Sequence, residues 1–301
     1  MKILLTGASG FIGSHLLEYL KHYNLVVLTR STPKAEIRLS HITFGHVSFI
    51  ESLNELDNFN DIDAIINLAG ESIFNKRWSK EQKENICQSR WELTTQLVDK
   101  CKASSNPPHI FISGSAVGYY GDQQSHSLDE MHSSPITGFT HLVCDTWEKI
   151  ANQAQSEHTR VCTIRTGIVL GKKGGALAKM LLPYQCGLGG PIGDGKQYMP
   201  WIHIEDMTQA ILFLLNNNNA QGVYNLTSPH PVSNIKFSRS LAKVLRRPHF
   251  LSTPASMIKL VLGESSVLLL DSIKAKPKHL VDSGFHFHFP RIETALKDLL
   301  K

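Results

Sequence analysis

Three glycines close to the N-terminus have the type and the spacing to hold the phosphates of a dinucleotide. The run Thr6-Gly7-Ala8-Ser9-Gly10-Phe11-Ile12-Gly13 follows the apolar segment 2–6 and precedes apolar residues at helical spacing. Gly7 permits a tight turn, Gly10 lets the backbone approach a pyrophosphate, and Gly13 allows a helix to pack closely on a strand. The free N–H groups at the start of that helix attract phosphate. This context predicts a dinucleotide site made by Thr6, Gly7, Ser9, Gly10, Phe11, Ile12 and Gly13.

The end of the next apolar run, at residues 25–29, indicates which dinucleotide this is. An Asp or Glu there would hydrogen-bond the adenosine ribose of NAD, but the chain has Thr29, Arg30 and Ser31, with no acid before Glu36. The planar guanidinium of arginine can bind a 2′-phosphate through two hydrogen bonds. A solvated surface arginine is the alternative reading of Arg30. The pattern favours NADP(H) as the cofactor.

Composition excludes several classes of partner. The 301-residue chain carries a formal net charge of +5, and no dense block of Lys or Arg favours nucleic acid. No apolar run approaches the roughly 18 residues that cross a bilayer, and Thr6-Gly7 breaks the apolar start too early for a secretory signal. The five cysteines form no C-x-x-C pair, so no metal site is expected. We therefore expect a cytoplasmic protein whose partner is a small molecule.

The elements that must position these residues alternate between strands and helices. Apolar runs near 2–6, 25–29, 63–68, 109–113 and 161–165 are separated by helical patterns, which predicts a parallel sheet with helices on both faces. Right-handed crossovers make this an α/β doubly wound Rossmann fold. We assign residues 1–170 and 201–227 to that domain. The glycine-rich segment 171–200 and residues 228–301 form a smaller mixed substrate lobe, with ligand between the two parts.

One further segment alternates strictly. His286 and His288 stand between Phe285, Phe287 and Phe289, a pattern typical of a strand with polar residues outward rather than of a metal site.

Motifs along nearly the whole chain resemble the extended short-chain dehydrogenase/reductase superfamily of nucleotide-sugar epimerases, dehydratases and reductases. They are the opening glycine run, Asn67-Leu68-Ala69-Gly70, Ser113-Gly114-Ser115, Arg165–Gly171 and Trp201–Asp206. The chain is most similar to the subgroup labelled YfcH-like or SDR39U1-like epimerase family proteins. That similarity includes Glu71, Lys76-Arg77-Trp78, Ser89-Arg90-Trp91, Gly118–Gly121 and Gly263–Ser266. The word epimerase in this label is itself inferred from the fold.

The resemblance implies roles for individual residues. Leu68, Ala69, Gly70, Glu71, Arg90 and Ser113 would lie along the cofactor, and Ser115 would be the catalytic serine. A homodimer is an expectation from the resemblance alone.

The catalytic group of the superfamily is incomplete in this chain. Its members use Tyr-x-x-x-Lys on the helix after the serine strand, where the tyrosine is the acid or base and the lysine lowers the tyrosine pKa. When Glu148 is placed on the glutamate that follows this motif, Thr140 and Cys144 stand at the two positions. Arg90 stands where the superfamily has an asparagine. Of the usual catalytic group only Ser115 is present.

Three explanations remain open. Tyr119 or Tyr120 could supply the phenol, although aromatic packing at a loop would also explain both tyrosines. Glu71, Lys76 or Arg90 could supply charge near the nicotinamide. The third explanation is that the protein binds its cofactor without an acid–base step.

Substrate contacts are predicted at two places. Lys76, Arg77 and Trp78 combine two cations with an indole, which suits an anionic or aromatic substrate, although a surface cluster would have the same composition. Arg165, at a strand end, could orient a substrate anion or a loop. The sequence thus predicts an NADP(H)-dependent oxidoreductase or epimerase-like enzyme with an unknown substrate. The alternative is an NADP(H)-binding regulatory or sensor protein with little or no catalysis.

Overall fold

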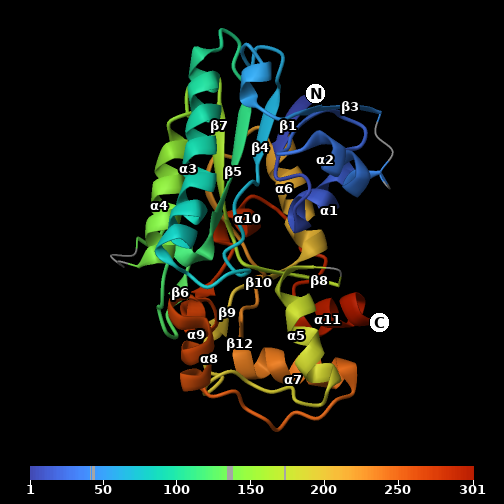
Figure 1. Ribbon diagram of the computed structural model, residues 1–301, viewed down its shortest axis with the longest axis vertical. Coiled ribbons are helices and arrows are strands. Elements are labelled where there is room, and N and C mark those ends of the chain that lie inside the picture. The colour runs from blue at the N-terminus through green and yellow to red at the C-terminus, as the bar shows by residue number, and fades with distance from the viewer. Residues whose placement is uncertain (41, 43–44, 134–137, 173) are drawn as a thin grey trace.

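Seven short strands pair in parallel to form the central sheet (Figure 1). The computed structural model describes residues 1–40, 42, 45–133, 138–172 and 174–301. The strand order is β11-β7-β5-β4-β1-β2-β3, so the winding changes direction between β1 and β4, where doubly wound sheets bind their ligands. The bounds are β1 Lys2–Thr6, β2 Asn24–Leu28, β3 His46–Ile50, β4 Ala64–Asn67, β5 Ile110–Ala116, β7 Arg160–Thr166 and β11 Gly222–Leu226.

Alternate residues of each strand pack against helices on opposite faces of the sheet. Ile3 and Leu5 share a buried cluster with residues of α1, α2 and α6, whereas Leu4 packs with residues of α3 and α4. Figure 1 shows α3 and α4 together on one side and α1, α2 and α6 on the other. These helices are α1 Phe11–Leu20, α2 Thr32–Leu39, α3 Lys80–Ala103, α4 Phe139–Asn152 and α6 Ile204–Asn216. The predicted doubly wound Rossmann fold is confirmed.

A smaller mixed lobe lies beyond the carboxyl ends of the strands (Figure 1). Its strands form pairs: β8 Ile168–Gly171 with β10 Trp201–His203, β9 Tyr198–Met199 with β12 Val232–Ser233, and β13 Lys274–Ala275 with β6 Ser127–Leu128. The β6 strand comes from the segment after β5, so its pairing with β13 connects the sheet domain to the lobe. The remaining helices are α5 Gly175–Gln185, α7 Asn234–Leu245, α8 Ala255–Leu262, α9 Val267–Leu270, α10 Lys278–Asp282 and α11 Ile292–Leu300, and short 3₁₀ turns cover Leu53–Glu55, Val117–Tyr119 and Gly263–Ser266.

The strand predicted around His286 and His288 is wrong, because residues 285–289 form no strand. The backbone N–H groups of His288 and Phe289 donate instead to the carboxylate of buried Asp206, at 2.7 and 2.9 Å. Phe285 and Phe287 pack edge to face, with ring centroids 4.8 Å apart. A side-chain acceptor has therefore replaced a neighbouring strand as the partner of this backbone.

Membrane-spanning helices and metal-binding clusters are both absent from the described residues. None of their helices is both long and apolar enough to span a membrane. In the same part of the chain, no three His, Cys, Asp or Glu side chains are grouped so that they could hold a metal ion.

Candidate functional site

The glycine run after β1 has room for glycine only. Gly7 has φ +73°, and a β-carbon there would lie 2.6 Å from the carbonyl carbon of Leu68. A β-carbon at Gly13 would lie 2.2 Å from the carbonyl oxygen of Gly7. Gly10 is the exposed N-cap of α1 and offers no capping side chain. The first turn of α1 therefore presents backbone N–H groups at the switch point of the sheet, as phosphate binding requires.

Thr6 ties this turn to the loop after β4. Its hydroxyl donates to Asn67 Oδ1 at 2.7 Å and accepts from the N–H of Ala69 at 3.2 Å. The Asn67 amide in turn donates to Thr94 Oγ1 at 2.9 Å, which also accepts from the indole of Trp147. Leu68 and Ala69 are thereby held beside the glycine turn. Ser113 on β5 is buried and lies opposite Asn67 in the sheet register.

Phe11 lies toward the lobe. β-Carbons at Gly171, Gly174 and Gly175 would each lie 2.5 to 2.8 Å from atoms of its ring. Gly175 also has φ +68°, which disfavours any other residue. The ring of Phe11 therefore joins the glycine turn to the connection between β8 and α5, while Ile12 packs against the core beneath α1.

At the end of β2, the predicted 2′-phosphate residues lie at the surface. Arg30 is exposed, Thr29 donates its N–H to the carbonyl of Ile50 at 2.9 Å, and Ser31 is the N-cap residue of α2. Sequence reasoning missed Glu51, which follows β3: its carboxylate accepts from the N–H of Thr32 at 2.6 Å. The sequence carries no local signal for this contact, because it depends on the parallel pairing of β2 with β3. An acid therefore stabilises the start of α2 from the neighbouring strand.

Arg90 on α3 supports the loop after β4 through hydrogen bonds. Its guanidinium donates to the carbonyls of Ile86 and Glu71, each at 3.0 Å. A β-carbon at Gly70 would lie 2.8 Å from the guanidinium carbon, so a larger residue there would displace the guanidinium. Burial lowers the pKa of Arg90. This predicted cofactor residue thus holds the Gly70–Glu71 backbone in place.

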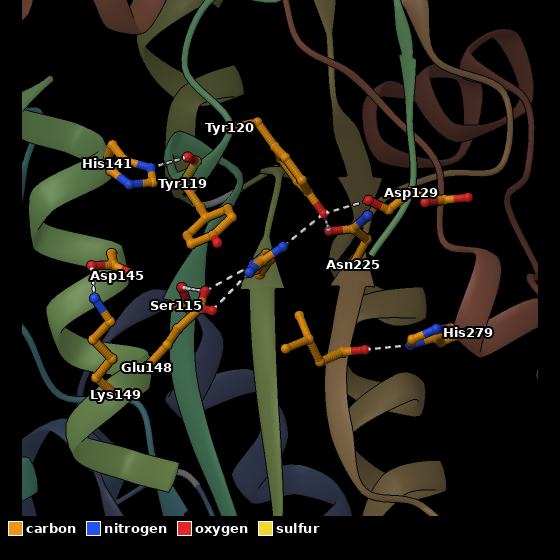
Figure 2. Close-up of polar contacts among 12 residues, drawn as sticks. Ser115, Tyr119, Tyr120, Asp129, His141, Asp145, Glu148, Lys149, Asn225 and His279 are labelled. Atoms are coloured by element: carbon orange, nitrogen blue, oxygen red, sulfur yellow. Dashed lines mark hydrogen bonds and ion pairs between the residues drawn. The ribbon is translucent and has the colours of Figure 1, made fainter. Parts of the chain in front are cut away.

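Ser115 on β5, Glu148 on α4 and Arg165 on β7 form a buried polar network, of which Figure 2 labels Ser115 and Glu148. The Ser115 hydroxyl donates to Glu148 Oε1 at 2.6 Å. Arg165 grips the same carboxylate with Nε and Nη2, both at 2.8 Å, in the bidentate geometry that arginine favours. Burial opposes the charge on Arg165, but the hydrogen bonds and charge of Glu148 outweigh it and raise the pKa of Arg165. Removing one partner of such a pair would leave an uncompensated buried charge.

The two tyrosines after Ser115 lie in different surroundings. Tyr120 is fully buried, and its hydroxyl lies 2.8 Å from Asn225 Oδ1 and 3.0 Å from Arg165 Nη1. Burial raises the pKa of Tyr120 to about 12. Tyr119 is only partly buried, and its ring centroid lies 3.5 Å from the guanidinium carbon of Arg165. Tyr120 thus completes the buried network, whereas Tyr119 lies at its edge, beside His141 (Figure 2).

Thr140 and Cys144 lie one turn apart on α4 and face the segment after β5. A β-carbon at Gly118 would lie 3.0 Å from that of Thr140, so the two residues are in close contact. Burial first, and then the charge of Glu148, raises the pKa of Cys144 to about 11. The thiol is therefore neutral at physiological pH and cannot supply the positive charge of the lysine that the superfamily has at this position.

The segment Lys76-Arg77-Trp78 divides between surface and core. Lys76 and Arg77 are exposed, with Lys76 Nζ 4.0 Å from Glu71 Oε1 and the Arg77 guanidinium against Gly263 of the lobe. Trp78 is buried: its indole donates to the carbonyl of Ile73 at 3.0 Å and packs edge to face on Phe139. The two cations thus lie where the loop after β4 meets the lobe, while the indole anchors that loop.

Two family models match the chain. Residues 3–227 match the NAD dependent epimerase/dehydratase family. Residues 253–299 match a domain of unknown function, DUF1731.

Similar proteins cover almost the whole chain. An epimerase family protein of Staphylococcus aureus is 35% identical in an alignment of 301 positions that covers 99% of this chain and 98% of that protein. The crystal structure of the human epimerase family protein SDR39U1 (isoform 2) with NADPH is 30% identical, with a TM-score of 0.89 and 99% of both chains covered. A nucleoside-diphosphate sugar epimerase from Corynebacterium glutamicum is 26% identical with a TM-score of 0.78, and the match covers 58% of that chain. The glycine turn, the parallel sheet and these matches together establish that the chain belongs to the NAD-dependent epimerase/dehydratase family, with the extended short-chain dehydrogenase fold and the epimerase family proteins as its near relatives.

Proposed function

We propose that the protein binds NADP(H) in preference to NAD(H). The observation that carries this proposal is Arg30, which lies exposed at the end of β2, with Thr29 and Ser31 beside it where an NAD-binding protein would place an acid. The turn from Gly7 to Gly13 fits a pyrophosphate, because its tight backbone leaves the N–H groups of α1 open. The human relative was crystallised with NADPH, whereas a UDP-glucuronic acid 4-epimerase of Bacillus cereus was crystallised with NAD.

The proposed activity is oxidoreductase or epimerase-like chemistry on a small molecule. The bound cofactor would supply or accept a hydride. Tyr119 is the better candidate for the proton step, because it is the partly exposed tyrosine, and Tyr120 is engaged by Arg165 and Asn225. Ser115 donates to Glu148, so in this arrangement it presents its oxygen as an acceptor. Lys76 and Arg77 would contact an anionic part of the substrate where the loop after β4 meets the lobe.

A regulatory or sensor protein that binds NADP(H) with little turnover is the second candidate. The observation that favours it is the pair Thr140 and Cys144. An aliphatic hydroxyl and a buried neutral thiol stand where the superfamily has its phenol and its ammonium group. The network of Ser115, Glu148 and Arg165 is also closed on itself by hydrogen bonds, as a structural support would be.

Titration of the purified protein with NADPH and NADH, followed by nicotinamide fluorescence, tests the cofactor. We expect NADPH to bind more tightly, and Arg30→Ala to weaken NADPH by about ten- to a hundred-fold, the size of a lost charge-assisted contact. NADH affinity should be nearly unchanged in that variant. Lys21→Ala, which removes an exposed cation at the far end of α1, is the matched control. Equal affinity for both nucleotides, or an Arg30→Ala protein that binds NADPH normally, would contradict the proposal.

A further inference from the structure

The lobe contains a hollow of about 570 Å³ away from the glycine turn. It lies where β9, β12 and β13 approach the start of α11, and six of its lining residues matter here: Tyr198, Lys236, Lys274, Lys276, Arg291 and Glu293. The volume is that of a small-molecule site. None of the residues assigned above to the cofactor or to the proton step lines it.

Positive charge is concentrated in this hollow. Four of its lining residues are cations, and Glu293 is the one acid among them, at 3.8 Å from Lys236 Nζ. Arg291 is the N-cap residue of α11, the end of a helix where the backbone dipole disfavours a cation. Like charges on a concave surface reinforce one another's potential and attract anions. The arrangement costs stability locally, and a bound anion would offset that cost.

The backbone that carries Lys274 and Lys276 is anchored by hydrogen bonds. Lys274 lies on β13 and its Nζ is 4.7 Å from the centroid of the Tyr198 ring. Tyr198 is held in turn, since its N–H donates to Ser272 Oγ at 3.0 Å and its carbonyl accepts from Ile273 N–H at 3.2 Å. The carbonyl of Lys276 accepts from the Asn225 amide at 3.0 Å, which anchors this side of β13 to the sheet. Lys274 and Lys276 therefore converge on the hollow from a rigid base.

We propose that this hollow binds a phosphate-bearing small molecule at a site separate from that of the nicotinamide cofactor. A phosphate group offers several oxygens to the ammonium groups of Lys236, Lys274 and Lys276, and its geometry matches the fork of the Arg291 guanidinium. The apolar floor, which includes Val232, suits the non-phosphate part of such a ligand. Because these groups are on the surface of a hollow and not along a groove, the ligand is a small anion and not a polymer.

Calorimetric titration with inorganic pyrophosphate in low-salt buffer tests the proposal. We expect a single saturable site in the nucleotide-free protein, weakened by about ten-fold or more in the double variant Lys274→Gln/Lys276→Gln. The control Lys21→Gln/Lys259→Gln removes the same charge from exposed residues elsewhere and should bind like the unmodified protein. Absence of saturable binding, or equal weakening in both double variants, would overturn the site.

A second arm separates this site from the cofactor turn. Saturating NADPH should leave pyrophosphate binding intact, and displacement of pyrophosphate by NADPH would show that it had occupied the glycine turn, which overturns the proposal. The Lys274→Gln/Lys276→Gln protein should keep the NADPH affinity of the unmodified protein. If NADPH binds neither protein, the cofactor proposal alone fails. Pyrophosphate binding by the two double variants still tests the proposed site in the hollow.

Discussion

Single side chains around Ser115 form a buried hydrogen-bond network. Glu148 accepts three hydrogen bonds, one from Ser115 and two from Arg165. Arg165 then reaches Tyr120. Such a network is stable only when each member keeps its partner. The proposed proton step therefore falls to a group at the edge of the network, and Tyr119 is the candidate that we propose.

Separate replacement of the two tyrosines by phenylalanine distinguishes these roles. Tyr119→Phe should reduce hydride transfer by about 10²- to 10⁴-fold, the usual contribution of a proton donor, and leave the free energy of unfolding nearly unchanged. Tyr120→Phe should keep turnover within a few-fold but cost about 1–2 kcal/mol of stability, because Asn225 and Arg165 each lose a buried partner. Consumption of NADPH with a substrate found by screening, and urea denaturation, provide the two readouts. Unchanged turnover in Tyr119→Phe would remove it as the proton donor.

Residue roles were only partly readable from the sequence. The glycine turn could be predicted because its requirements are local, namely φ angles and short contacts within one strand–turn–helix unit. The environments of Trp78, Arg90 and Glu51 could not, because each depends on a partner from another element. Trp78 packs on Phe139, Arg90 lies beneath Gly70, and Glu51 reaches the start of α2 from β3.

At the scale of elements, the start of α6 depends on a buried histidine. His203 is the N-cap residue, and its Nδ1 accepts from the N–H of Glu205 at 3.1 Å while its ring stacks on Phe289. Its Nε2 lies 3.3 Å from Asp298 Oδ2 on α11. Burial outweighs the attraction of Asp298 and lowers the pKa of His203 to about 4. The folded protein therefore holds this imidazole neutral.

This histidine predicts a loss of stability in mild acid. The unfolded chain takes up a proton at its ordinary pKa near 6.5, whereas the folded chain does so near 4. The stabilising contribution is therefore complete above pH 6.5 and is lost as pH falls toward 4, reaching about 2 kcal/mol lost at pH 5. Urea denaturation at pH 7.5 and pH 5 measures this change in the free energy of unfolding. His203→Asn keeps a capping oxygen but cannot titrate, so its loss between the two pH values should be smaller by that amount. The same pH dependence in both proteins would argue against His203.

Elements themselves were predictable where hydrophobic period and length agreed. The strands β1, β2, β4, β5 and β7 and the helix α1 are examples, whereas β3 was not predicted. The strand expected at 285–289 was wrong because strict alternation of Phe and His also suits an irregular segment that packs its rings and bonds its backbone to Asp206. The pairing of β6 with β13 could not be predicted either, since it joins two-residue strands that are far apart in the chain.

At the scale of the whole molecule, Gly171, Gly174 and Gly175 pack against the ring of Phe11 and so join the lobe to the sheet domain. Gly175 has φ +68°, and a β-carbon there would lie 2.7 Å from the carbonyl oxygen of Val169 and 2.8 Å from the ring of Phe11. Gly187, at the other end of α5, has φ +76° but no atom within 4 Å of a β-carbon position. The two glycines therefore share backbone strain on substitution, and only Gly175 adds a steric clash.

Replacement of each glycine by alanine measures that contact. Gly187→Ala should cost about 1 kcal/mol from the left-handed backbone alone. Gly175→Ala should cost about 2–4 kcal/mol, because overpacking adds to the same strain. Thermal unfolding of both variants gives the difference, and NADPH affinity should fall in Gly175→Ala only, since Phe11 begins the helix that carries the phosphate-binding N–H groups. Equal losses of stability in the two variants would show that the Phe11 ring can move aside without cost.

The packing of Phe11 against the glycines of the lobe also relates to the order in which the chain is synthesised. The glycine motif is synthesised before the glycines that enclose its aromatic ring, because Gly171 is the last residue of β8 and Gly174 and Gly175 follow it. A nascent or truncated chain that ends before that point would carry every residue of the turn and leave Phe11 without its packing partners. We therefore expect nucleotide binding only once synthesis has passed Gly175 and Phe11 can pack against its partners.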